Sequence, residues 1–324
     1  MSSIHEEYRT IIDGAGLVRR AHFGRLEFAG PDAVSFLQAL LTNDVSRLGG
    51  TSGLYAAYLT PQGRMLADLE LHAIGDRLLA EVAPGTATAL ASRFDQLIFA
   101  EDVRVTDVSP TTSETVMVGG GAADVTGRVV GVPAHALQDL AELEHLAWRG
   151  GIVARSGESP LPMFKVFALN RDAGDVEEDL RRAGAIEVSD DLADAMRIAS
   201  GRTRFGVDLD GDTIPLEAGL LDRAISTSKG CYVGQEIIIR MLHRGGGRVA
   251  KRFAILSVSG ARVAPAAGSA LLADDREFGR LTSVAPAFDG DGFIALGHVH
   301  RDRADVGQSF AVGDAVATLT GFAQ

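Results

Sequence analysis

Short antiparallel strands are the feature that most constrains the fold of this chain. Three apolar segments, at 54–59, 65–74 and 78–82, are separated only by tight turns at 60–63 (TPQG) and 75–76 (GD). Connections this short join antiparallel strands, whereas parallel strands need a crossover of a dozen or more residues. The pattern predicts a three-stranded meander and argues against a parallel βαβ array.

Helical patterns are interspersed with these strands. Residues 24–30 alternate as a half-buried strand should, and Pro31 and Asp32 then open a helix. A helix is also predicted over 137–148, and another begins where Ser189 can cap the first turn. Since strands and helices mix without a regular alternation, the sequence predicts the α+β class.

From Arg252 onward, helical periodicity disappears. Short strand-like segments are divided there by Gly, Pro and Asp, a composition typical of small β-barrels. A length of 324 residues agrees with two or three domains. We therefore expect a C-terminal β-barrel as a separate unit.

Charge and composition limit the classes of function. A net charge of −12 argues against broad affinity for nucleic acid. Basic residues do gather between Arg240 and Arg252, and they form either a local nucleic-acid contact or an ordinary solvated surface. With no long apolar run and an acidic start, we expect neither export nor membrane insertion. The single cysteine, Cys231, excludes an internal disulfide and a four-cysteine metal site, and fits a reducing cytoplasm.

The segment 228–236 holds the densest chemistry. Gly230 and Gly234 permit tight turns around Cys231, and a predicted helix begins directly afterwards. A cysteine near a helix N-terminus and beside Lys229 is a candidate reactive thiol. Lysine occurs only at 165, 229 and 251, which indicates a specific need for an ammonium at 229. The alternative is that Cys231 is a small buried apolar residue.

Residues 229–236 (KGCYVGQE) resemble the K-G-C-Y-x-G-Q-E signature of the YgfZ family, part of the glycine-cleavage T-protein (aminomethyltransferase-like) superfamily. Segments 36–45, 61–65 and 297–300 also resemble conserved parts of that superfamily, so the resemblance covers nearly the whole chain. It implies a T-protein-like fold around a central folate cavity. The expected domains are a folate-binding region over 1–248, built from two interleaved subdomains (1–50 with 111–248, and 51–110), and a barrel over 249–324.

The resemblance also implies a ligand and a site. Tetrahydrofolate, or a one-carbon-substituted folate, would occupy the central cavity, with the 229–236 loop on its rim and no metal. Cys231 would act in thiol chemistry, with Lys229 stabilising its thiolate, and the basic run would meet the anionic glutamate tail. The candidate folate-binding residues are Phe23, Glu217, Tyr232, Gln235, Glu236 and Arg240.

Two departures from the aminomethyltransferases bear on activity. Residues 82–89 contain no carboxylate where those enzymes carry an acidic residue, and 197–201 reads RIASG in place of RLEAG. Methylene transfer needs a positioned proton acceptor, so we expect no active aminomethyltransferase. The leading hypothesis is a folate-binding accessory protein that supports iron–sulfur proteins or cluster assembly factors, including tRNA-modifying enzymes. The alternatives are a folate-dependent aminomethyltransferase or demethylation enzyme, and a non-catalytic module that binds tRNA or protein through 240–252.

Overall fold

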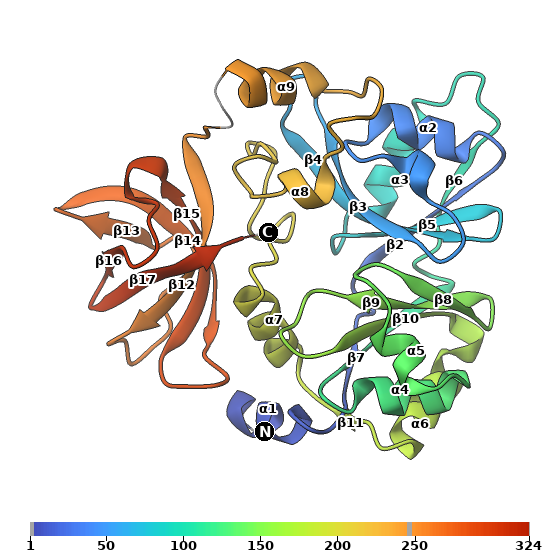
Figure 1. The fold of residues 1–324 in the computed structure, drawn as a ribbon, viewed down its shortest axis with the longest axis horizontal. Helices are drawn as coiled ribbons and strands as arrows, with labels where there is room; N and C mark the ends of the chain where they lie inside the picture. The colour runs from blue at the N-terminus through green and yellow to red at the C-terminus, as the bar shows by residue number, and fades with distance from the viewer. Residues whose placement is uncertain (1–2, 245–247, 324) are drawn as a thin grey trace.

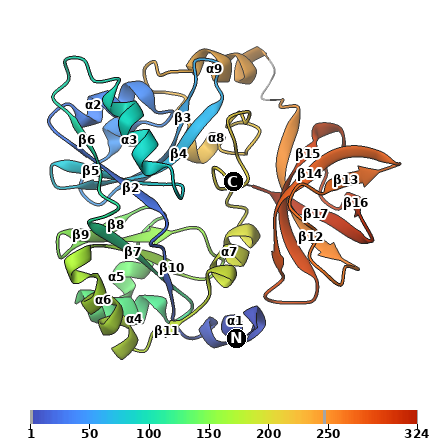
Figure 2. The same cartoon turned by 180° about the vertical axis from the view of Figure 1, so that it is seen from behind.

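Three units surround a common centre in the computed structural model, which describes residues 3–244 and 248–323. Two sheet-based subdomains lie one above the other, and a β-barrel stands beside both (Figure 1). The view from behind shows the same three-part arrangement (Figure 2). The predicted α+β class is confirmed.

The first subdomain is built on a six-stranded sheet with the order β11-β1-β7-β10-β9-β8. Helices α4, α5 and α6 lie on the side of this sheet away from the second subdomain (Figure 1). Their apolar residues form one core with Leu17, Met117 and Phe164. The strands are β1 (Gly16–Arg19), β7 (Thr112–Val118), β8 (His145–Trp148), β9 (Gly151–Ser156), β10 (Met163–Leu169) and β11 (Ile186–Glu187), and the helices are α4 (Ala122–Val130), α5 (Ala134–Gln138) and α6 (Asn170–Arg182).

The second subdomain is a five-stranded sheet with the order β3-β4-β5-β2-β6, covered by two helices. Phe94 of α3 packs edge-on against Phe28 and Phe36 in its core. The predicted meander is confirmed by β3, β4 and β5. The elements are β2 (Gly24–Ala29), α2 (Ala33–Leu40), the short turn η1 (Val45–Arg47), β3 (Gly53–Leu59), β4 (Met65–Ile74), β5 (Arg77–Val82), α3 (Ala87–Asp95) and β6 (Arg104–Asp107).

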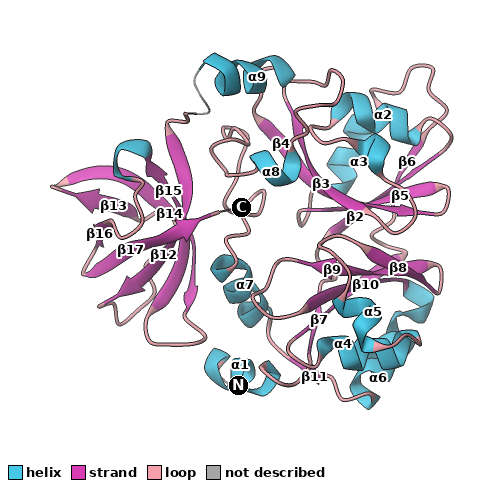
Figure 3. Ribbon diagram, viewed as in Figure 1, coloured by secondary structure: helices cyan, strands magenta, loops and turns pink. Residues whose placement is uncertain are grey.

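The predicted C-terminal barrel is confirmed: six strands close in the order β12-β15-β14-β13-β16-β17. It is built almost entirely of strands, whereas helices gather around the two sheets (Figure 3). Ala254, Leu256 and Val258 alternate inward along β12, as a half-buried strand requires. The elements are β12 (Lys251–Ser259), β13 (Ala270–Ala273), β14 (Arg276–Pro286), β15 (Phe293–His300), the short turn η2 (Arg301–Arg303), β16 (Ser309–Val312) and β17 (Ala315–Phe322).

Helices α1 (Ile4–Ile11), α7 (Asp190–Ala199), α8 (Leu221–Ala224) and α9 (Gln235–Arg244) connect these units. Ser189 caps α7 through a bond from the Leu192 amide, as the sequence predicts. Arg197 on α7 then donates to Asp208 at 2.7 Å and to Ser283 on β14 at 3.1 Å. These contacts fix the barrel against the first subdomain.

Two predictions about chain organisation are wrong. Residues 24–50 belong to the second subdomain and not with 111–248, because β2 pairs with β5 and β6. The predicted helix over 137–148 ends early, since α5 stops at Gln138 and 145–148 forms β8 in a hairpin with β9. Among residues 3–244 and 248–323, no helix is long and apolar enough to cross a membrane.

Candidate functional site

A central cavity lies where the two sheets and the segment after α7 meet. The space between its walls is about 500 Å³, including the part open to solvent. The cavity is lined by Phe23, Tyr55, Asp68, Glu70, Glu81, Val82, Ala83, Glu158, Arg197, Arg202, Thr203, Arg204 and Arg223.

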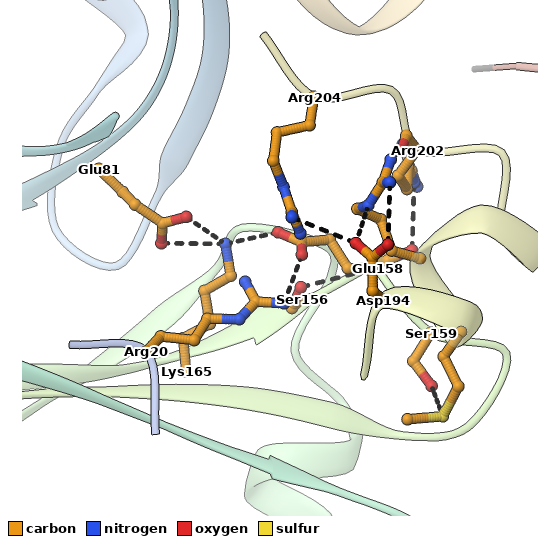
Figure 4. A network of polar contacts seen from close by, with 12 residues as sticks. Arg20, Glu81, Ser156, Glu158, Ser159, Lys165, Asp194, Arg202 and Arg204 are labelled. Carbon is orange, nitrogen blue, oxygen red and sulfur yellow. Dashed lines mark hydrogen bonds and ion pairs between the residues drawn. The ribbon is translucent and has the colours of Figure 1, made fainter. Parts of the chain in front are cut away.

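The cavity floor is a buried ion cluster centred on Lys165 of β10, which is fully buried. Its ammonium lies 2.8 Å from a Glu70 oxygen, 3.0 Å from Glu81 and 2.9 Å from Glu158. Figure 4 shows Lys165 between Glu81 and Glu158, with Arg20 beside them. Oxygens of the three carboxylates lie within 4.8 Å of one another, as metal ligands would. In this cluster the cation between the carboxylates is the Lys165 ammonium.

The carboxyl groups of this cluster differ in the direction in which their pKa values are shifted. Burial alone would raise the pKa of Glu70, but Lys165 and a bond from His72 lower it to about 2. Burial alone would also raise the pKa of Glu158, yet Arg20 and Lys165 hold that pKa well below the usual range. By contrast, burial raises the pKa of Glu81.

Glu114 of β7 adds a further buried carboxyl to the same network. Burial and the neighbouring Glu81 raise its pKa well above the usual value. Neither of its oxygens has a hydrogen-bond partner among the described residues, and Arg20 Nη1 lies 3.8 Å away. Glu114 thus adds a fourth carboxyl group to the cluster around Lys165 and Arg20.

A pair of histidines extends the floor towards β8. His72 Nε2 lies 3.1 Å from Glu70, His72 Nδ1 lies 3.3 Å from His145 Nδ1, and His145 Nε2 lies 2.9 Å from the Ala73 carbonyl. Because a carbonyl only accepts, His145 Nε2 carries a proton and its Nδ1 accepts from His72. The two histidines thus link β4 of the second subdomain to β8 of the first.

The cavity wall combines one carboxyl group with aromatic rings and arginines. Asp68 accepts from the Tyr55 hydroxyl at 2.7 Å and from the Phe205 amide at 3.3 Å, and burial raises its pKa. The guanidinium groups of Arg20 and Arg204 lie against the Phe23 ring, with their central carbons 4.9 Å and 5.1 Å from the ring centre. A flat ligand can reach the Phe23 face only by displacing one of these guanidinium groups.

The structure corrects the role predicted for Lys229. Its ammonium donates to the carbonyls of Gln38, Leu41 and Asn43, each at 2.7 Å. An ammonium has three donors, and all three are used at the end of helix α2. Burial lowers the pKa of Lys229 to about 8, while the three carbonyls favour the protonated form. Lys229 therefore joins the 229–236 loop to α2, and its donors are not available to the Cys231 thiolate.

Cys231 itself is exposed, contrary to the alternative of a buried apolar residue. Its neighbour Tyr232 is buried in the core below the loop. Of the predicted site residues, Phe23 lines the central cavity, while the described residues of the 229–236 loop lie outside its lining. The loop is therefore not part of the cavity wall, and its predicted place on the rim stays a prediction.

Two segments singled out in the sequence contact each other. A Cβ on Gly234 would lie 2.6 Å from the Thr60 carbonyl, and one on Gly63 would lie 2.9 Å from Ile237 of α9. Both glycines have positive φ, at 84° and 73°. The β3–β4 turn and the 229–236 loop are thus shaped to pack closely.

Glu217 lies beside the barrel, whereas the other remaining predicted residues lie on α9 beside the second subdomain. Glu217 lies 3.9 Å from Lys251, and its carbonyl accepts from the Phe253 amide of β12. Glu236 and Arg240 pair on exposed α9 at 3.6 Å, and Gln235 begins that helix. In the basic run, 245–247 lies outside the described residues, while Arg248 and Arg252 line a separate hollow together with Arg301.

The ion cluster was missed at the level of sequence, although a signal was present. Asp68, Glu70 and His72 occupy every second position of a strand that is otherwise apolar, so they share one face of β4. Lys165, one of three lysines, likewise lies within a strand of apolar residues. Polar residues spaced by two within a buried strand mark a polar interior surface.

Comparisons with known proteins agree with this architecture. The glycine cleavage system aminomethyltransferase T from Bartonella henselae superimposes with a TM-score of 0.86 over 98% of this chain and 88% of that chain, at 21% sequence identity. This likeness confirms the T-protein-like fold.

Relatives by sequence carry transferase names. A putative chloroplastic transferase of Arabidopsis thaliana is 26% identical over 95% of this chain and 70% of its own length. An aminomethyltransferase of Rubrobacter xylanophilus is 30% identical over 75% of this chain and 66% of its length, and one of Listeria welshimeri is 24% identical over 96% and 86%. The family model for the GCVT N-terminal domain matches residues 1–229. The chain belongs to the GCVT N-terminal domain family, whose fold it shares with the aminomethyltransferases.

Proposed function

We propose that this protein binds tetrahydrofolate, or a one-carbon-substituted folate, in the central cavity. The observation that carries the proposal is the placement of Asp68, a carboxyl group aimed at the cavity between Tyr55 and the arginine wall. A pterin presents several N–H donors on one edge, and a buried carboxylate accepts such donors strongly. Arginines at the mouth suit the carboxylates at the other end of the molecule.

The test is titration calorimetry with tetrahydrofolate against the protein and its Asp68→Asn variant. We expect binding to the protein and a loss of roughly ten- to a hundredfold in the variant, because a charge-assisted hydrogen bond is removed. Asp139→Asn removes an exposed carboxylate elsewhere and serves as the control. Absence of binding at millimolar ligand refutes the proposal.

The finer proposal is an accessory role in the cytoplasm, supporting iron–sulfur proteins and tRNA-modifying enzymes. It rests on the KGCYVGQE resemblance and on the exposure of Cys231, which leaves the thiol accessible to a partner. A lone thiol cannot hold a cluster, so partner ligands would complete any such contact. Restoration of iron–sulfur enzyme activity in deficient cells by Cys231→Ala, as fully as by the unchanged protein, refutes the thiol role.

A second candidate, aminomethyl transfer, is favoured by one observation. Val82 and Ala83 line the cavity without a carboxylate, but Asp68 stands in the same cavity with a raised pKa, as a proton acceptor requires. Turnover of tetrahydrofolate with an aminomethyl donor, lost in Asp68→Asn, would establish this enzyme. We favour the accessory role because Glu70, Glu81 and Glu158 are held by Lys165.

A further inference from the structure

A three-residue contact joins two arginines of the central cavity to one carboxylate. Glu142 accepts from Arg202 Nη2 at 2.7 Å through one oxygen and from Arg223 Nη2 at 3.2 Å through the other. Both arginines line the cavity, and the Glu142 side chain is about one-third exposed. We call Glu142, Arg202 and Arg223 the rim latch. It connects the α5–β8 segment to the segment after α7 and to helix α8.

The backbone around Glu142 is shaped for this contact. Leu143, the next residue, has a φ of 68°, a left-handed conformation that side chains other than glycine rarely adopt. Its amide is held by the Arg155 carbonyl at 2.8 Å, and the side chain is buried. A Cβ on Gly157 would lie 2.6 Å from both Arg202 Nη2 and the Glu142 carboxyl carbon. The strained backbone of Leu143 thus adjoins the carboxylate, and Gly157 leaves room beside it.

The two arginines are also positioned from the cavity side. Arg202 Nε donates to the Gly157 carbonyl at 3.1 Å, and the Arg223 guanidinium stacks at 4.5 Å over the Tyr55 ring. Two oriented guanidinium groups sharing one carboxylate form a receptor for a planar oxyanion. Since Glu142 is partly exposed, exchanging it for another carboxylate costs little, as the modest strength of exposed ion pairs indicates.

We propose that Glu142 is an internal stand-in for a ligand carboxylate. A carboxylate-bearing ligand displaces Glu142 from Arg202 and Arg223 as it enters, and the latch closes again when it leaves. This inference rests on the proposed function, because it takes the ligand to be a folate whose glutamate tail lies at the mouth.

Calorimetry with two ligands tests the latch: tetrahydrofolate, and 6-methyltetrahydropterin, which has no carboxylate. We expect Glu142→Gln to bind tetrahydrofolate roughly three- to tenfold more tightly, because the internal competitor is weakened, and to bind the pterin unchanged. Arg223→Met should weaken tetrahydrofolate binding and cancel the gain in the double variant. The control, Asp139→Asn, removes an equal charge from an exposed position three residues earlier and should leave both affinities unchanged.

The outcomes separate the two proposals. Binding of both ligands with no gain in Glu142→Gln, or with an equal gain for the pterin, overturns the latch and leaves the folate site intact. An equal gain in Asp139→Asn assigns the effect to net charge and also overturns the latch. Failure of every protein to bind either ligand overturns the proposed function and the latch together.

Discussion

Replacing Lys165 with Met should convert a stabilising ion cluster into a pH-dependent weakness. Methionine keeps the length and apolar stem of lysine but removes the ammonium that lies within 3.0 Å of three carboxylates. In the variant those carboxylates face one another in a buried site, and Arg20 is the cation that remains beside them. The fold loses the cation that joins β10 of the first subdomain to β4 and β5 of the second.

The magnitude follows from Glu70. A pKa of about 2 against an ordinary value of 4.5 corresponds to about 3 kcal/mol of stabilisation at neutral pH. Removing one partner of a buried ion pair costs about 3–5 kcal/mol, which agrees with this figure. Since domains of this kind unfold with about 5–15 kcal/mol, Lys165→Met should lose a large share of its stability at pH 7.5.

The pH dependence has a definite sign. In the unchanged protein, the lowered pKa of Glu70 stabilises the fold above about pH 4.5, and this stabilisation is lost as pH falls through 2. Without Lys165 the folded carboxyls hold protons more tightly than the unfolded ones. The variant should therefore regain stability as pH falls from 7.5 to 5.5, by up to about 1.4 kcal/mol per pH unit for each proton taken up.

Urea unfolding at pH 7.5 and 5.5, followed by circular dichroism, measures both effects. Lys251→Met is the matched control, because Lys251 is one-third exposed and lies 3.9 Å from a single carboxylate, Glu217. It should change stability by less than about 1 kcal/mol at either pH. An equal loss at both pH values in Lys165→Met would refute the electrostatic account and leave only a packing defect.

Two further predictions concern the 229–236 loop and the barrel. Lys229→Met should lower the free energy of unfolding by about 1–3 kcal/mol, because three carbonyls at the end of α2 lose their donor, whereas exposed Cys231→Ala should change it by less than about 0.5 kcal/mol. Equal effects of the two variants in urea unfolding would contradict this assignment. Gly279→Ala should destabilise the protein by about 2–4 kcal/mol in thermal unfolding, since its Cβ would lie 2.0 Å from the His298 carbonyl oxygen. In the control, Gly290→Ala, the added Cβ meets no atom within 4 Å and should leave stability unchanged. Similar melting temperatures for the two variants would refute the close approach at Gly279.

Local patterns in the sequence determined the individual elements. The tight turns at 60–63 and 75–76 fix an antiparallel meander, because no crossover fits between the strands. The barrel was predictable for a similar reason: inward and outward residues alternate along short strands divided by turn residues. The helix over 137–148 failed because pairing of 145–148 with β9 overrides local helical spacing.

Long-range packing decided the site. The KGCYVGQE segment indicates a loop and a helix, but only the fold shows that Lys229 ends on carbonyls of α2, nearly 190 residues earlier in the chain. The cavity residues come from strands of two different sheets, and Lys165 meets Glu70 and Glu81 across the junction. Side-chain periodicity specifies which residues share a face, whereas the partner of that face depends on how the sheets stack. For this reason the sequence determined the strands and turns of the meander and the barrel, whereas the tertiary structure alone decided that Cys231 is exposed and which charges meet.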